Sequence, residues 1–156
     1  MADISAFTAI PNTLWAGNNI QDFTASGALK AGQVVSIDAT GVSMTVRAAV
    51  AEAGEMPIGV AVNTVADGEK VAVATDGCIC YVANFDDTTA IDAGSFLEVN
   101  DCAVGGTVGA VAVTATGGAT VTVHNAVIGV ALDDIAGGGT GRMLIRGLAV
   151  TQANSS

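Results

Sequence analysis

Few residues in this sequence have the type and spacing that catalysis requires. His124 is the only histidine, so a Ser–His relay would have to use it, and a histidine cluster around a metal is excluded. It stands in Thr-Val-His-Asn, where a strand gives way to a turn without a nucleophile elbow. Such a histidine is expected to be an ordinary surface or turn residue. The sequence therefore predicts that the protein is not an enzyme.

The three cysteines do not specify a cross-link. Cys78 and Cys80 are two residues apart and Cys102 is remote, so there is no CxxC pair. In a strand, the first two thiols would project from one face, too far apart for an easy disulfide. An odd number of cysteines indicates neither a disulfide framework nor a zinc site. We expect reduced thiols packed in the core.

Loop carboxylates are the remaining candidates for chemistry: they are Asp86, Asp87, Asp92, Asp133 and Asp134. They form two groups, at 86–92 and at 133–134, and either could hold a hard cation. Neither group has the Asp-x-Asp-x-Asp-Gly spacing of a calcium-binding loop, so solvated turns are expected instead. The glycine run at 137–141 lacks the Gly-Lys-Ser/Thr ending and following helix of a phosphate loop. It predicts a flexible hairpin tip. No metal or other cofactor is predicted.

Composition limits the partners. Five Lys and Arg against fifteen Asp and Glu give a formal net charge of −10, so cations for tracking phosphates are scarce and nucleic acid is not expected as a partner. The chain has no apolar run of membrane-spanning length and opens without a secretory signal pattern. We expect a soluble product made in the cytoplasm, with no membrane partner.

The elements are expected to be short strands. Hydrophobic residues make up 51% and aromatic residues 4% of the chain, and side chains such as Val and Ala suit closely packed sheets. Alternating apolar segments predict strands of about 4–6 residues at 33–38, 42–46, 58–62, 71–74, 78–82, 96–99, 108–113, 119–123, 127–132 and 142–145. Glycine turns are predicted at 39–41, 66–68, 75–77, 116–118 and 137–139. For residues 47–55, a short helix and an Ala-rich loop both remain open.

Residues 1–27 differ from the rest of the chain. They have neither strand nor helix period, yet they carry the only Trp and two of the four Phe. They predict an extended N-terminal arm whose apolar side chains bind a partner, while folding back on its own domain stays open as the alternative. The predicted partner-binding residues are Phe7, Ile10, Leu14, Trp15, Ile20 and Phe23.

The chain repeats itself. Residues 58–68, beginning Ile-Gly-Val-Ala, align with residues 128–138 at an offset of 70, and Ala-Gly at 31–32 aligns with Ala-Gly at 93–94 at an offset of 62. The glycine within Ile-Gly-Val-Ala leaves room for another backbone or a bulge. Two such copies bury together what neither buries alone. We expect an all-β fold over 28–156, a compact β-barrel or sandwich of related halves at about 28–90 and 91–150.

The order Ala-Gly-x-Val-Val, Ile-Gly-Val-Ala, a short glycine turn and Val-x-Val resembles the small capsid decoration (cement) proteins of tailed phages, with a β-tulip or β-clip-like fold. The pattern occurs twice, covers about residues 28–150, and is closer in the second copy, at 127–141. The chain departs from it at Gln33, where the family often has an acidic residue, and at 100–126, an insertion that lengthens the second half.

The resemblance implies a homotrimer on the outer surface of the virion that clamps neighbouring subunits of the major capsid protein and stabilises the assembled shell. Another virion module, such as a tail-tube or fibre-base protein, remains open as the alternative. An enzyme or a carbohydrate-binding module would need an aromatic or acidic cleft, and one Trp and one Tyr equip it poorly.

Overall fold

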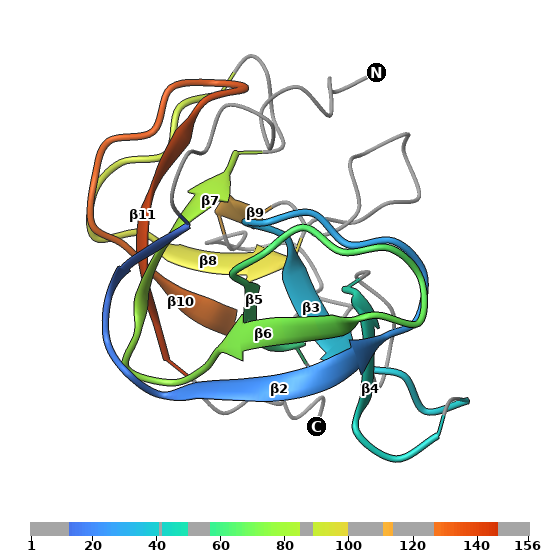
Figure 1. The fold of residues 1–156 in the computed structure, drawn as a ribbon. Helices are drawn as coiled ribbons and strands as arrows, with labels where there is room; N and C mark the ends of the chain where they lie inside the picture. The colour runs from blue at the N-terminus through green and yellow to red at the C-terminus, as the bar shows by residue number, and fades with distance from the viewer. Residues whose placement is uncertain are drawn as a thin grey trace, which may run out of the picture.

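A computed structural model describes residues 13–40, 42–49, 57–84, 89–99, 111–113 and 127–146. Every regular element among them is a β-strand, so the predicted all-β fold is confirmed (Figure 1). The strands are β1 (Leu14–Ala16), β2 (Ile20–Ala25), β3 (Val34–Ile37), β4 (Thr45–Ala48), β5 (Pro57–Ala61), β6 (Lys70–Ala74), β7 (Ile79–Ala83), β8 (Phe96–Val99), β9 (Val111–Val113), β10 (Val127–Ala131) and β11 (Thr140–Ile145). Within these ranges no helix has the length and apolarity to cross a membrane.

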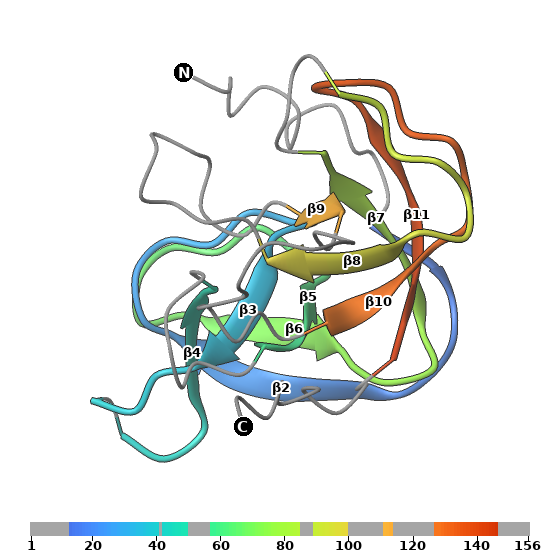
Figure 2. The ribbon, with the colours of Figure 1, turned by 180° about the vertical axis from the view of Figure 1, so that it is seen from behind.

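The strands form two sheets that lie against each other (Figures 1 and 2). One is a closed barrel in the order β2-β4-β3-β5-β6, and the other is a six-stranded sheet in the order β1-β7-β11-β10-β8-β9. Neighbouring strands are antiparallel except β2 and β4, whose parallel pairing closes the barrel. The predicted architecture of two related halves is therefore present as a barrel and a sheet.

The two halves share one pattern of strand pairing. Strands β2, β4, β3, β5 and β6, the first unit, correspond to β7, β9, β8, β10 and β11, the second unit. The parallel pairing that closes the barrel also has a counterpart in the second unit. The parallel pairing of Ala25 with Val46 has its counterpart in an isolated parallel bridge between Asn84 and Val111. The units thus share the order of their five strands, which closes fully in the first unit and by a single bridge in the second, and the repeat seen in the sequence is a repeat of topology and register.

Both copies of Ile-Gly-Val-Ala carry the same β-bulge. Between β3 and β5, Val35 pairs with Gly59 and the register then shifts; between β8 and β10, Leu97 pairs with Gly129 and the register shifts in the same place. A Cβ on Gly59 would lie 2.1 Å from the Ala74 carbonyl oxygen, and one on Gly129 would lie 2.3 Å from the corresponding oxygen of the other unit. The expectation of a bulge and a close backbone is confirmed.

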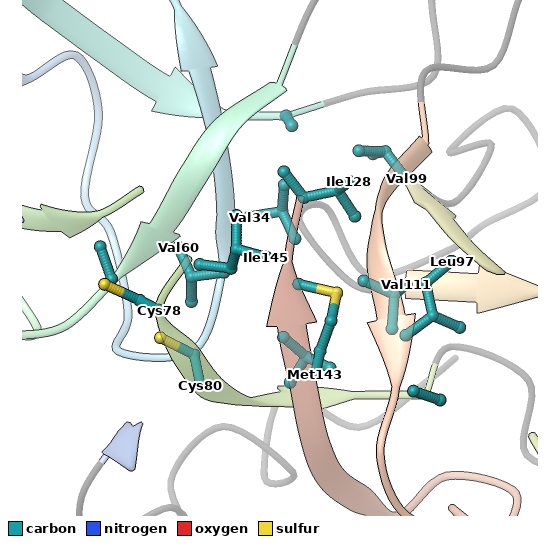
Figure 3. Close-up of a cluster of buried hydrophobic side chains, with 14 of the residues drawn as sticks. Val34, Val60, Cys78, Cys80, Leu97, Val99, Val111, Ile128, Met143 and Ile145 are labelled. Atoms are coloured by element: carbon teal, nitrogen blue, oxygen red, sulfur yellow. The ribbon is translucent and has the colours of Figure 1, made fainter. Parts of the chain in front are cut away.

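One core lies inside the barrel and a second joins the units. The barrel interior holds Phe23, Ala25, Leu29, Val35, Val46, Ala61, Val65, Val71 and Val73. The joint core combines Val34 and Val60, from the outside of the barrel, with second-unit residues that include Ile128 and Ile145 (Figure 3). Cys78 and Cys80 are free thiols buried in this joint core, as predicted, and burial raises the pKa of Cys80 to about 12.

The N-terminal arm expected over residues 1–27 is wrong for residues 13–27. Strands β1 and β2 lie there, and β2 is a wall of the barrel. The local pattern conceals β2 because its buried positions follow two exposed polar residues, Gln21 and Asp22, so no regular alternation appears. The boundary between the halves is also displaced, since β7, placed by the sequence in the first half, opens the second unit. Residues 1–12 lie outside the described residues.

Smaller differences concern element bounds. The strand predicted at 42–46 runs instead from Thr45 to Ala48, because Met44 has a positive φ of 61° and belongs to the turn before it. For residues 47–55 the sequence left a short helix and a loop open; residues 47 and 48 belong to strand β4, and residues 50–56 lie outside the described residues. So do the strand predicted at 119–123 and the turn predicted at 116–118. The turns at 66–68, 75–77 and 137–139 are present.

Candidate interaction surfaces

A row of apolar side chains crosses the outer face of the second unit. Phe96 on β8 pairs with Val130 on β10, which pairs with Leu144 on β11, which pairs with Ile79 on β7. Directly paired residues point to the same side of a sheet, so the four form one stripe, which we call the outer row. Phe96 is 51% exposed, and the other three side chains are half-buried. An outward face of a solvated sheet normally carries polar residues.

The first unit has the same row in the same register. Val34 pairs with Val60, which pairs with Ala74, which pairs with Ile20. Here, however, Val34, Val60 and Ala74 are fully buried, because they belong to the joint core and the second unit covers them. The same structural position is thus covered in one unit and partly exposed in the other.

An aromatic and charged group lies beside the outer row; we call it the Trp15 cluster. Trp15 on β1 is 56% exposed and meets Tyr81 on β7 edge to face, with ring centroids 6.1 Å apart. The guanidinium carbon of Arg142 lies 4.7 Å from the Trp15 ring centroid, within the range of a cation–π contact. Trp, Tyr and Arg are the residue types that dominate the binding energy of protein interfaces.

Asp133 fixes the orientation of Arg142. The Arg142 Nε donates to Asp133 Oδ2 at 2.9 Å and its NH2 group donates to Oδ1 at 2.6 Å, while the Arg142 backbone N–H also donates to Oδ2. These hydrogen bonds lower the pKa of Asp133 to about 2 and raise that of Arg142 above its ordinary value. The forked geometry holds the guanidinium plane in place against Trp15.

A second apolar surface lies at the β3–β4 hairpin. Val42 is 83% exposed and Met44 is more than half exposed; we call these two residues the hairpin tip. The tip is anchored, because the Thr24 N–H donates to the Met44 carbonyl and Asp38 accepts hydrogen bonds from the Thr40 backbone and hydroxyl. Hydrogen bonds from the Ser26 and Thr40 hydroxyls, with that from the Thr40 N–H, lower the pKa of Asp38 to about 2.

The residues predicted to bind a partner have separate fates. Trp15 lies on the surface, Leu14 packs against the joint core, and Ile20 ends the buried row of the first unit. Phe23 is only 7% exposed, inside the barrel, so a partner reaches it only if the barrel opens. Phe7 and Ile10 lie outside the described residues.

Two of the carboxylates considered for a cation, Asp133 and Asp134, have structural tasks. Asp134 Oδ1 accepts the Ala93 N–H, and Asp133 holds Arg142. Thr64 Oγ1 makes the corresponding bond to the Ala31 N–H in the first unit. In the ranges that the structure covers, no group of three or more His, Cys, Asp or Glu is arranged for a metal. Asp86 and Asp87 lie outside those ranges.

Sequence reasoning missed Phe96, Tyr81, Leu144 and Arg142 as surface residues. A signal for them exists in the repeat: Leu144 stands where the first copy has Ala74, and Phe96 stands where it has Val34. Larger apolar residues at matched positions of the second copy indicate that this face differs in its surroundings from the same face of the first copy.

The chain matches no protein-family model and no curated protein sequence.

Proposed function

We propose that this protein decorates the outside of a tailed-phage capsid, where it binds the assembled major capsid protein as a homotrimer and stabilises the shell. The proposal is carried by one observation: a body of two repeated β-units has two separate apolar surfaces. The segment between β3 and β4, which carries the hairpin tip, and strand β11, which carries part of the outer row, lie on opposite sides of the molecule in both views (Figures 1 and 2). A decoration protein that is also a homotrimer needs two such surfaces on one body, one for the shell and one for its own copies.

The physical mechanism is linkage between binding and assembly. A protein that binds the assembled lattice and not its free subunits adds its binding free energy to the stability of the lattice. Many copies on one shell multiply a modest contact. The net charge of −10 gives decorated particles a repulsive surface that keeps them soluble. The repeated Ala-Gly and Ile-Gly-Val-Ala pattern, which resembles capsid decoration proteins, supports the same function.

Within this function, the hairpin tip and residues 1–12 are the proposed shell contacts. Val42 and Met44 present apolar side chains on an anchored turn, which lowers the entropy cost of ordering them on binding. Phe7 and Ile10 are the remaining apolar anchors of the N-terminal segment. A segment of this kind can add a strand to a sheet edge of a capsid subunit.

The test is binding to the particles made by the genome that encodes this chain. Recombinant protein should co-sediment with expanded shells and not with unexpanded shells or free capsid subunits, and it should raise the temperature at which the shells break. Val42→Asp should weaken binding at least roughly tenfold, whereas Asp76→Asn, on the exposed turn before β7, should not. A protein that ignores shells but co-purifies with tails supports the tail-tube or fibre-base alternative and overturns the proposal.

A further inference from the structure

At the outer row the two units present the same cross-strand row in different states of burial. Val34, Val60 and Ala74 are fully buried, while their counterparts Phe96, Val130 and Leu144 face solvent at least in part. Identical pairing register makes the comparison residue by residue. What covers the first row therefore indicates what fits the second.

The cover on the first row comes from the second unit of the same chain. Cys78, Ile128 and Ile145 share the joint core with Val34 and Val60, and Figure 3 shows Val34 and Val60 beside Ile128 and Ile145. These covering residues lie on the edge of the second unit where β7 begins and β11 ends. The two units thus stack with one face of the first against a different face of the second.

The first unit carries the counterpart of that covering edge. Asn19 corresponds to Cys78 and Thr75 to Ile145, since the Thr75 N–H donates to the Asn19 carbonyl at 2.9 Å and the Ile145 N–H donates to the Cys78 carbonyl at 2.9 Å. Ile58 corresponds to Ile128 in the repeat. Asn19 is exposed, and Ile58 and Thr75 are half-buried. This edge, which we call the Asn19 edge, is partly accessible to a second molecule, with Ile58 also packed against the barrel interior.

We propose that a second copy of this chain covers the outer row, by placing its Asn19 edge on Phe96, Val130 and Leu144. The contact repeats between molecules the stacking that already joins the two units within one molecule. The Trp15 cluster borders the same face and supplies aromatic and Arg side chains of the kind that anchor interfaces. The polar Asn19 and Thr75, in place of Cys78 and Ile145, suit a surface that is solvated before association.

This contact joins two different surfaces, so it is heterologous, and it generates a closed ring or an open chain of copies. Each copy carries a net charge of −10, so association strengthens as salt screens the repulsion. The inference adds to the proposed function the surface through which copies meet. It is tested without any shell, and so its failure is separate from the failure of shell binding.

The experiment measures the mass of the full chain by sedimentation velocity over a range of concentrations. Val130→Asp, on the outer row, and Asn19→Arg, on the opposite edge, should each weaken self-association at least roughly tenfold with an unchanged circular dichroism spectrum. Ala66→Asp is the matched control: it adds the same charge to the exposed turn between β5 and β6, outside both surfaces, and should associate like the unaltered protein.

Mixing the two defective variants gives the sharpest result. One intact pair of surfaces remains between Val130→Asp and Asn19→Arg molecules, so the mixture should form dimers and nothing larger. The proposal is overturned if the unaltered protein is monomeric at about 100 µM, a concentration well above the dissociation constant of even a weak specific complex. The proposal is also overturned if the Val130→Asp variant associates normally. It is equally overturned if Val130→Asp loses association while Asn19→Arg assembles fully.

Discussion

Gly59 and Gly129 show how single residues set the spacing of this fold. Each sits at a bulge where the neighbouring strand's carbonyl passes within 2.1 or 2.3 Å of the site of a Cβ. No rotamer change relieves such a clash, because the obstacle is backbone. The repeated glycine therefore exists to let β5 approach β6, and β10 approach β11.

Gly59→Ala should lower the free energy of unfolding by about 3 kcal/mol, since the new methyl group forces two strands apart. The measurement is chemical unfolding followed by circular dichroism. Gly68→Ala is the control: Gly68 has a positive φ of 79° but open space around its Cβ position, so it should lose about 1–2 kcal/mol from backbone strain alone. Equal losses at both positions would contradict the steric explanation.

Asp133 offers a pH-dependent test at the same scale. Its pKa is lowered to about 2 from an ordinary 3.8 by Arg142, so the ionised carboxylate favours the folded state above about pH 4, and this contribution is lost as the pH falls towards 2. The variant Asp133→Asn should show a shallower loss of stability than the unaltered protein over that range. Denaturant midpoints measured from pH 6 to pH 2 test this.

Asparagine is a suitable replacement because the first unit already uses it. Asn63 Oδ1 accepts the Ala72 N–H at 2.8 Å, at the place where Asp133 accepts the Arg142 N–H, so the backbone hydrogen bond can survive the change. Asp38, whose pKa is also lowered, titrates alike in both proteins. Parallel stability curves for the two proteins would show that the ion pair does not contribute.

Strand β1 is the element whose role the sequence concealed. It precedes the first unit along the chain but pairs with β7 of the second unit, and the Tyr81 N–H donates to the Thr13 carbonyl at 2.8 Å beside it. Deleting residues 1–16 removes this pairing and uncovers an edge of β7. Deleting residues 1–12 keeps it.

The longer deletion should therefore be less stable than the shorter one by about 2 kcal/mol or more, from the lost packing of Leu14 and the lost strand pairing. Denaturant unfolding of the two truncated proteins, side by side, gives the difference directly. If both unfold at the same denaturant concentration, β1 contributes nothing to the sheet.

Elements with a local pattern were predictable and those defined by distant pairing were not. Residues 58–62 and 127–132 show alternation and a repeated glycine, and the observed β5 and β10 follow them closely. Strand β2 lacks alternation, and its parallel pairing with β4 joins residues about twenty apart, which no local period encodes. The outer row was not predicted either, because its exposure depends on which unit covers which; its sign in the sequence is the larger side chains of the second copy, Leu144 for Ala74 and Phe96 for Val34.

The joint core predicts that the whole molecule unfolds as one body. Val34, Val60 and Ala74 of the first unit are buried only with second-unit residues around them, so the joint core is lost when either unit unfolds. A cavity made deep in the barrel should therefore destabilise the distant sheet.

Val46→Ala makes such a cavity inside the barrel and should lower the free energy of unfolding by about 1–3 kcal/mol. Fluorescence of Trp15, which reports on the second sheet, should shift its midpoint as far as circular dichroism does. An unmoved Trp15 transition would mean that the two units unfold independently.

The crossed path of β1 also sets an order of events during synthesis on the ribosome. All five strands of the barrel, residues 20–74, leave the exit tunnel before β7 does, but β1 has no strand to pair with until then. Val34 and Val60, on the outside of the barrel, stay uncovered for longer still, because Ile128 and Ile145, which cover them, are among the last described residues to be translated. A nascent chain thus carries a closed barrel with an uncovered apolar side through most of its elongation, and a translational pause before residue 128 should prolong its need for a chaperone.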